Sequence, residues 1–498
     1  MLRTQLEASC VTHVQYHQPP ETQYLPLFSN REVTSTMLLP LPTLEPRYVC
    51  PGETHAISRA VHLSRLAAFY PKCHECGHRQ EIGQLPQPQF SDEATDDSSS
   101  QNRSLFTLEG IRGVYLNELN RHKAAEFATA FASLLWDALP LAGRSDLRDS
   151  KSKRPARRLG PVVVVGFDER PSSPDLVAGV ATALRRMSCQ VVDIGQTSVP
   201  CFRFAVAHMQ AAGGVMITGH GCEPSWTGLD FVGKQGRPIS AARPQSTARQ
   251  STADSARLMS LDDLLARNER GVGRPLRQAG TQRVFQASVP YLAGLWKHFH
   301  ALRPLRVAIG CPVRRIRQTI DELFAQLPVT LHWFDVPQRR RDLLKEDDLD
   351  KERLRTAVAA TSSDFGLLID DDGANVAVVD ELGEWLRQDS LFSLVAEPLL
   401  AESSQAAIVI ENGAREKMQP LVAAMGARCL LGGWTQSELW QSLQHDAAVC
   451  GGGSSGRIWL RETFPTTDAI LTLAKLLQAL SRDDRPMSEA VKPVVPAA

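Results

Sequence analysis

The stretch VMITGHGCEPSWTG at 215–228 leads from apolar residues directly into small and polar ones. Its first part, 215–217, predicts a strand, and the residues after it could bring backbone amides and side chains to a phosphate or a metal. His220 could carry a phosphoryl group or act as a general base near neutral pH, and Cys222 is a second candidate nucleophile. A histidine in a glycine-rich loop is also common as an ordinary polar surface residue, so both interpretations stand.

A CxxC pair, Cys73 and Cys76, forms the tight turn that lets two thiolates reach one zinc ion. Tetrahedral closure needs two further ligands, and nearby residues could supply them: Cys50, His55, His62, His74 and His78. A zinc ion held by Cys50, Cys73, Cys76 and His55 would be structural, because no open coordination position is implied. The alternative is a helical hairpin with incidental thiols, since a single CxxC is a weak signal.

Length and composition limit the class of protein. At 498 residues the chain is too long for one compact core, so we expect several domains. Lys plus Arg and Asp plus Glu both number 55, so net charge gives no reason to expect nucleic acid as a partner. No apolar run approaches the roughly 20 residues that span a membrane. The scattered cysteines indicate buried thiols in a reducing compartment, and we expect a cytoplasmic protein.

Strand and helix patterns alternate from residue 105 onward. A short strand is expected before Gly110 and a helix over 116–139, followed by buried strands at 162–165 and 191–195 and the strand at 215–217. Repeated βα units predict an α/β fold, with parallel or mixed sheets covered by helices on both faces. Ligands of such sheets bind at the carboxyl ends of strands, where 218–224 falls.

Four motifs occur in this order: GIRG at 110, VVVGFDERPSSP at 163, VMITGHGCEP at 215 and IDDDGANVAVVDELGE at 369. Together they resemble the α-D-phosphohexomutase family, which includes phosphoglucomutase, phosphomannomutase and phosphoglucosamine mutase. The resemblance covers roughly residues 105–480. It implies three consecutive α/β/α domains with mixed sheets, here preceded by a small N-terminal region that is a candidate for zinc binding.

The resemblance and the composition together predict the domain boundaries. In chain order we expect a poorly ordered arm at 1–45, a small helical region with the CxxC turn at 46–90, a linker at 91–104, domain I at 105–285 with a flexible insert at 234–282, domain II at 286–385, domain III at 386–482 and a tail at 483–498. The tail carries no SGT motif, so we expect the family's fourth domain, which holds the nonreacting phosphate, to be absent.

In the family, a phosphoserine gives its phosphoryl group to a sugar phosphate, and the bisphosphate turns over and returns the other phosphate. The resemblance places His220 at the phosphoserine position, with Arg112 and Arg170 in the same site. Asp230 stands where the family has a lysine, so a candidate cation has become an anion.

The family's metal loop DGDADR reads DDDGAN here, so Asp370 and Asp372 retain two of three Mg²⁺ ligand positions and Ala374 replaces the third. We therefore expect Mg²⁺ binding to be weakened. The sugar loop GGExSGH reads GGGSSGR, which leaves three candidate substrate-binding residues: Gly452, Ser455 and Arg457.

Loss of a covalent nucleophile typically lowers turnover by about 10⁶, so ordinary mutase activity through a phosphoserine is not expected. The first interpretation is a pseudoenzyme of carbohydrate metabolism that binds a hexose phosphate or related small molecule, or regulates. The second is an active phosphotransferase or phosphomutase, an isomerase with altered chemistry, that uses His220. The third is an interaction protein that acts through the N-terminal region. The sequence leaves open which applies and what the oligomeric state is.

Overall fold

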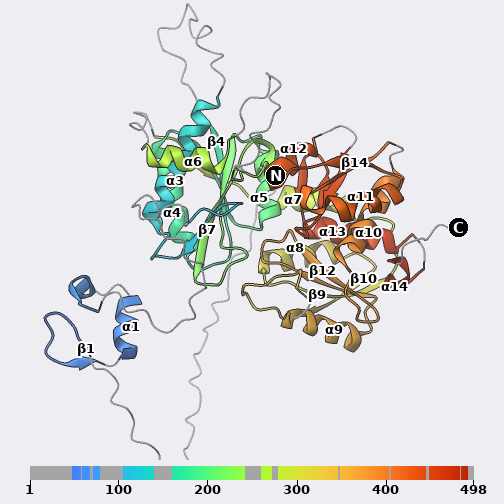
Figure 1. Ribbon diagram of the computed structural model, residues 1–498, viewed down its shortest axis with the longest axis horizontal. Coiled ribbons are helices and arrows are strands. Elements are labelled where there is room, and N and C mark those ends of the chain that lie inside the picture. Colours follow the sequence, from blue (N-terminus) through green and yellow to red (C-terminus); the bar gives the residue numbers. More distant parts are fainter. Residues whose placement is uncertain are drawn as a thin grey trace, which may run out of the picture. The chain divides into compact units, whose positions relative to one another are not determined.

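The computed structural model describes residues 48–57, 59–67, 71–78, 105–139, 160–241, 259–271, 279–345, 348–402, 405–444, 448–482 and 484–491 (Figure 1). The chain divides into two compact units, Met1–Thr95 and Asp96–Ala498. The expected arm at 1–45 and linker at 91–104 lie outside the described residues, as do 242–258 and 272–278 of the expected insert.

The described part of the first unit has little regular structure. Strand β1 (Tyr48–Val49) pairs antiparallel with β2 (Ala56–Ile57). Helix α1 (Arg59–Ala67) follows, and a short 3-10 helix, η1 (Pro71–Glu75), contains Cys73. Only Tyr48, Cys50 and Ile57 form a buried apolar cluster among these described residues. Such a core is small for an independent unit.

The second unit contains three sheets (Figure 1). The first has the order β3-β7-β6-β4-β5-β8. Its strands are β3 (Ile111–Val114), β4 (Val162–Phe167), β5 (Gln190–Gln196), β6 (Gly213–Ile217), β7 (Trp226–Val232) and β8 (Gln282–Val284). Strands β8, β5, β4 and β6 run parallel, and β7 and β3 are antiparallel to their neighbours. The mixed sheet predicted from the βα pattern is therefore confirmed.

Helices cover both faces of this sheet. The side chains of each strand point alternately to the two faces, so both faces present apolar residues against which helices pack. Val163 and Val165 pack in the cluster that includes α3 (Arg121–Asp137), α4 (Ser173–Arg186) and α6 (Leu261–Glu269). Val164 packs in the opposite cluster, with α5 (Val199–His208) and α7 (Ser288–Trp296). Both clusters are continuous, so the sheet is buried on both sides.

Two expected elements of domain I were wrong in position. The first strand begins at Ile111, after Gly110 rather than before it, because the Thr107 hydroxyl donates to Gly110 O and closes a turn there. The first long helix begins at Arg121 rather than near 116, because the Asn120 side chain accepts from the amides of His122 and Lys123. Such a cap fixes a helix start more sharply than apolar spacing does.

The second sheet has the order β10-β9-β11-β12 and the third has the order β14-β13-β15-β16-β17. The strands are β9 (Leu305–Gly310), β10 (Val329–Phe334), β11 (Phe365–Ile369), β12 (Val376–Asp380), β13 (Ala407–Ile410), β14 (Arg428–Leu431), β15 (Ala448–Gly452), β16 (Trp459–Arg461) and β17 (Pro465–Thr467). The helices are α8 (Arg314–Phe324), α9 (Leu349–Thr361), α10 (Gln388–Ala401), α11 (Arg415–Ala424), α12 (Gln436–Ser442), α13 (Ala469–Leu480) and α14 (Met487–Ala490). Each sheet mixes parallel and antiparallel pairs.

One apolar cluster joins the three sheets. It contains Met216 of the first sheet, Val307 of the second and Ile408 of the third, all buried. Helices α5, α7, α8, α10 and α13 contribute to the same cluster, and α10 packs against α13. Because these helices are shared, the loops of the three sheets are held in fixed positions relative to one another.

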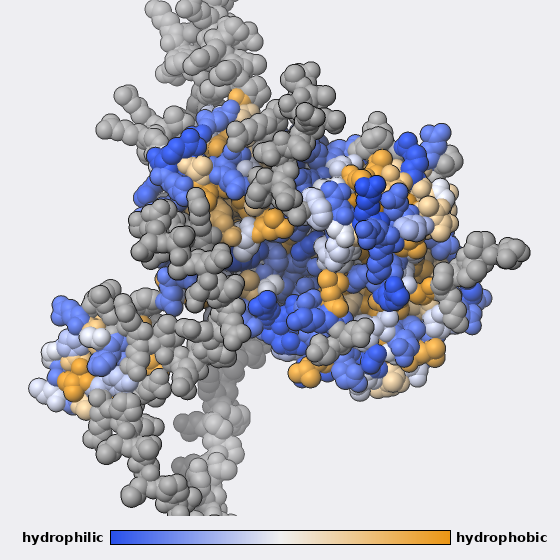
Figure 2. Space-filling view, in the orientation of Figure 1, coloured by the Kyte–Doolittle hydropathy of each residue, from blue (hydrophilic) through white to orange (hydrophobic). Residues whose placement is uncertain are grey.

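On the coloured part of the surface in Figure 2, charged and polar residues predominate, and hydrophobic residues lie in smaller groups. The exposed large apolar residues are scattered along the described chain, for example Val284, Leu349 and Trp434. None of the described helices has the length and apolarity that crossing a membrane would require.

Candidate functional site

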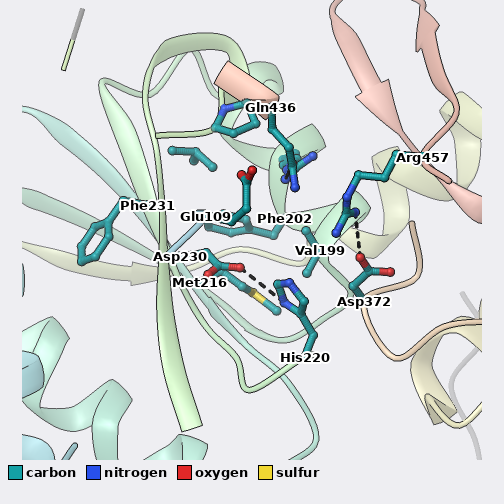
Figure 3. Close-up of a pocket in the computed structure, with 13 residues that line it drawn as sticks. Glu109, Val199, Phe202, Met216, His220, Asp230, Phe231, Asp372, Gln436 and Arg457 are labelled. Carbon is teal, nitrogen blue, oxygen red and sulfur yellow. Dashed lines mark hydrogen bonds and ion pairs between the residues drawn. The ribbon is translucent and has the colours of Figure 1, made fainter. Parts of the chain in front are cut away.

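His220 lies in the loop between β6 and β7, beside two charged residues of the same sheet. Arg112 on β3 pairs opposite Gly228 on β7, so its side chain is on the same face as Asp230, two residues further along. Arg112 Nη1 donates to Asp230 Oδ1 at 2.6 Å. Arg112 Nη2 lies 3.3 Å from Nδ1 and 3.2 Å from Nε2 of His220. Figure 3 shows the His220 ring turned toward Asp230, whose Oδ2 lies 3.4 Å from Nδ1.

The electrostatics of this cluster favour a neutral imidazole beside an ionised carboxylate. Burial, and then the Arg112 charge, lower the pKa of His220 below its ordinary value. Burial opposes ionisation of Asp230 as well, but the charges of Arg112, His220 and Arg203 and the hydrogen bond from Arg112 together outweigh it, and the pKa of Asp230 is lowered. A neutral imidazole can accept a proton or a phosphoryl group, yet both of its ring nitrogens here contact the same guanidinium.

Arg170 is 2% exposed and holds the backbone of the loop that carries His220. Its Nη1 donates to the carbonyls of Glu223 at 2.7 Å and Trp226 at 3.1 Å, and its Nη2 donates to that of Cys222 at 3.0 Å. Burial raises the pKa of the Cys222 thiol, although nearby arginines oppose this. Arg170 therefore organises the loop, and it does not line the cavity next to His220.

The loop after β11 brings Asp370, Asp371 and Asp372 to the edge of the second sheet, and they have different partners. Asp371 accepts from Gly221 N at 3.1 Å, and Arg170 Nη2 lies 3.4 Å from its Oδ2. Asp370 Oδ1 accepts from the Asp371 amide at 2.8 Å. Burial, and then the charges of Asp372 and Asp371, raise the pKa of Asp370 well above its ordinary value.

Asp372 is paired with Arg457 of the third sheet's loop. Arg457 Nη1 lies 2.8 Å from Asp372 Oδ2, and this contact is drawn in Figure 3. Burial opposes ionisation of Asp372, but Arg457 and other neighbours outweigh it and its pKa is about 2. The predicted metal loop and the predicted sugar loop are thus brought together through this one ion pair.

His220, Asp372 and Arg457 line a common cavity of about 20 Å³, which has room for about one water molecule. Three charged or polar residues that the sequence analysis did not single out also line it: Glu109, Arg203 and Gln436. Glu109 directly precedes the GIRG motif, and burial raises its pKa against the opposing charge of Arg457. Arg203 lies within the largely apolar helix α5. A charged residue in such a helix is the sequence feature that could have identified it as a site residue.

Arg203 links the first sheet's helix to the third sheet. Its Nη2 donates to Gln436 Oε1 at 2.9 Å and its Nη1 to Thr467 Oγ1 at 3.3 Å. Its Nε is buried without a hydrogen-bond partner among the described residues. Burial, and then the Arg457 charge, lower the pKa of Arg203 to about 10.

Two predicted substrate-binding residues do not line this cavity. Ser455 Oγ donates to a carboxylate oxygen of Glu411, and the Ser455 amide donates to the other oxygen at 2.9 Å. Gly452 is buried at the end of β15, where its carbonyl accepts from the Glu411 amide at 3.0 Å. Glu411 therefore holds the glycine-rich loop, and of the three predicted residues only Arg457 reaches the cavity.

The predicted zinc ligands lie in the first unit. Cys50, Cys73 and Cys76 are buried, and Arg65 Nη1 lies 3.1 Å from Cys50 Sγ. Burial, and then the charges of Cys50 and Cys76, raise the pKa of Cys73. His55 is exposed, with Nε2 3.3 Å from Glu53 Oε2. Throughout the described ranges, no group of three or more His, Cys, Asp or Glu is arranged to hold a metal ion.

Residues 151–257 match the family described as phosphoglucomutase/phosphomannomutase, alpha/beta/alpha domain I. The chain is 26% identical over 331 residues to a phosphomannomutase/phosphoglucomutase of Pseudomonas aeruginosa, which spans 65% of this chain and 67% of that protein. It is 22% identical over 398 residues to a phosphoglucomutase/phosphomannomutase of Thermococcus kodakarensis, which spans 78% and 79%. These matches support a member of the α-D-phosphohexomutase family.

A solved structure of a phosphoglucomutase/phosphomannomutase family protein from Burkholderia thailandensis shares the fold of this phosphohexomutase family member. The two have a TM-score of 0.64 and 22% identity, and 80% of each chain is covered. The predicted α/β architecture with mixed sheets is therefore confirmed for the second unit.

Phosphohexomutases generally depend on Mg²⁺. In this family member the residues at the metal loop do not fit the ion. Asp372, one of the two predicted ligands, is paired with Arg457, and Ala374 offers no side-chain ligand. The adjacent Asp371 is directed to Arg170. Mg²⁺ needs several oxygen ligands in near-octahedral geometry around one point.

Proposed function

We propose that this chain is a phosphohexomutase homologue without mutase turnover, which keeps the cleft as a hexose-phosphate-binding or regulatory site in carbohydrate metabolism. The observation that carries the proposal is the cluster around His220, which the resemblance places at the phosphoserine position. There His220 replaces the nucleophile, and both of its ring nitrogens contact Arg112, which is itself paired with Asp230. Loss of such a nucleophile typically lowers turnover by about 10⁶.

Ligand binding would require the cleft to open. The cavity beside His220 holds about 20 Å³, whereas small-molecule sites typically measure about 300 to 1,000 Å³. The Asp372–Arg457 and Asp371–Gly221 contacts close it between loops of the three sheets. A bound phosphate would compete with these carboxylates for the arginines, and this supports a regulatory role in which ligand shifts an open–closed equilibrium.

A panel of hexose phosphates and nucleotide sugars tests the proposal by calorimetry and thermal shift, alongside a mutase assay primed with glucose 1,6-bisphosphate. We expect a saturable shift for at least one sugar phosphate and no turnover. If none of these compounds binds, the ligand-binding part of the proposal is wrong. Mutase turnover by the wild-type protein would overturn the whole proposal.

A second candidate function is phosphoryl transfer through His220. It is favoured by the lowered pKa of His220, caused by burial and Arg112, because an imidazole must be neutral to attack phosphorus. Incubation with labelled glucose 1,6-bisphosphate should then yield acid-labile phosphate that is lost in His220→Ala. His122→Ala, at an exposed position on α3, is the matched control. Labelling that is equal in both variants would contradict a role for His220.

We also propose a structural zinc ion for Cys50, Cys73, Cys76 and His55. Support comes from the burial of the three thiols and from the small apolar cluster of the first unit. Small units commonly need a metal for stability. Metal analysis of the purified full chain, with Cys73→Ser as the comparison, would detect zinc in the wild type alone. The free cysteines of the described residues also support a cytoplasmic location.

A further inference from the structure

Every oxygen of Asp372 is already bonded within the protein. Its Oδ1 accepts from the Ala374 amide at 2.7 Å and from the Asn375 amide at 3.3 Å. Its Oδ2 lies 2.8 Å from Arg457 Nη1. The carboxylate is 2% exposed and the Arg457 side chain 15%, so solvent screens this pair only weakly.

The neighbouring aspartate is turned toward the first sheet. Both oxygens of Asp371 accept from the Gly221 amide, at 3.1 and 3.2 Å, and Arg170 Nη2 lies 3.4 Å from Oδ2. Asp371 and Asp372 therefore bind cations that come from different domains. Two carboxylates that diverge in this way cannot share one small divalent ion.

The charges around the cavity balance without an added ion. Three arginines meet three carboxylates there: Arg112, Arg203 and Arg457, and Glu109, Asp230 and Asp372. Arg112 pairs with Asp230 at 2.6 Å, and Arg457 pairs with Asp372. An arginine keeps its charge at any physiological pH, so this balance does not depend on a bound metal.

We infer that the Arg457 guanidinium is the resident counter-ion of Asp372 and that this cleft takes no Mg²⁺. Arg457 comes from the loop after β15 and Asp372 from the loop after β11, so their pair also ties the third sheet to the second. In this protein a side chain supplies both the charge and the cross-link that a divalent ion would supply. The inference does not depend on whether the cleft binds a hexose phosphate.

The primary test is a titration of the full wild-type chain with Mn²⁺, which favours the same oxygen ligands as Mg²⁺ and is counted by electron paramagnetic resonance. We expect no saturable Mn²⁺ binding by the second unit. Mg²⁺ and EDTA should leave the melting temperature unchanged, apart from any change caused by removing zinc from the first unit. One Mn²⁺ per chain that is lost in Asp372→Asn would overturn the inference.

A pair of variants tests the role of Arg457 itself. Ala374→Asp restores a third carboxylate while Arg457 stays in place, and Ala374→Asp/Arg457→Ala also removes the guanidinium. We expect the double variant to bind Mn²⁺ at least about tenfold more tightly than Ala374→Asp, because the guanidinium no longer neutralises Asp372. Equal Mn²⁺ binding by the two variants would contradict the assignment.

Melting temperature gives an independent readout with Arg457→Ala. We expect this variant to melt below the wild type, because the buried Asp372 carboxylate loses its counter-ion. Arg428→Ala, at an exposed arginine on β14 of the same domain, should show no such loss. A melting temperature of Arg457→Ala equal to that of the wild type would contradict the role given to Arg457. Should Arg457→Ala fail to fold, the wild-type titration still decides the question.

Discussion

Tyr291 on α7 donates a hydrogen bond of 2.6 Å to Asp468, the residue that caps α13, and both side chains are buried. Asp468 also accepts from the Ile470 and Leu471 amides. The Asp468 carboxyl therefore links α7, which lies in the chain between the first and second sheets, to the start of α13, which follows the third sheet. The junction on which the site depends therefore contains a titratable group.

The Asp468 carboxyl makes stability depend on pH. Burial raises its pKa from 3.8 to about 6, so the folded protein binds its proton more tightly than the unfolded chain. This contribution is complete below pH 3.8 and is lost as pH rises through about 6, which at roughly 1.4 kcal/mol per pH unit amounts to about 3 kcal/mol. Asp468→Asn should remove this fall in the free energy of unfolding.

Urea unfolding at a series of pH values measures the effect. Asp335→Asn, at a fully exposed carboxylate, is the control and should keep the wild-type pH dependence. A pH dependence in Asp468→Asn that matches the wild type would contradict the role given to this carboxyl.

Glu169 caps a helix of another domain. It follows β4, and its two carboxylate oxygens accept from the amides of Arg314 at 3.0 Å and Arg315 at 2.8 Å, at the start of α8. The helix's own N-cap, Val313, has no side chain able to do this. Glu169→Ala should lower the free energy of unfolding by about 1 to 2 kcal/mol, and Glu169→Gln by less.

Glu322→Ala, at an exposed glutamate on α8, is the matched control for this cap. It removes one carboxylate from α8 itself without touching the N-terminal amides that Glu169 caps. If Glu169→Ala and Glu322→Ala unfolded at the same urea concentration, the cap would contribute nothing.

Gly179 allows α4 to approach α3 closely. A Cβ at this position would lie 2.6 Å from Arg121 O and 2.7 Å from Arg121 Cγ. Gly179→Ala should therefore cost about 1 to 3 kcal/mol by overpacking, despite the better helix propensity of alanine. Thr182→Ala, exposed on the same helix, should change stability by less than about 0.5 kcal/mol. Thermal melting compares the two variants. If Gly179→Ala melted at the wild-type temperature, α3 and α4 would have to lie further apart than these distances indicate.

Restoring only the serine should not restore the reaction. In His220→Ser the hydroxyl would still face the Arg112–Asp230 pair, while Arg457 still neutralises Asp372. We expect no mutase turnover and no acid-stable phosphate after incubation with glucose 1,6-bisphosphate, because catalytic groups that act together are not restored singly. Mass spectrometry of the intact chain measures the phosphate. Phosphorylation of Ser at 220 with turnover would show that the remaining site is competent.

The sequence determined the sheets of this protein well. The strands expected at 162–165, 191–195 and 215–217 lie within β4, β5 and β6. Buried strands of parallel pairs are continuous β-branched runs, so they can be read locally. The first strand and the start of α3 were misplaced, because Thr107 and Asn120 fix them through single hydrogen bonds.

The sequence also predicted, from the resemblance, which residues stand at the positions of the family's loops, including His220, Ala374 and Arg457. Only the tertiary structure decided which of them meet. Arg457 and Asp372 are 85 residues apart, and Arg112 and His220 are 108 apart. Such pairs form because the shared helices of the central core hold three sheets' loops together. A charge pattern in sequence cannot reveal which cation neutralises which carboxylate, since that depends on distances of a few ångströms in the folded chain.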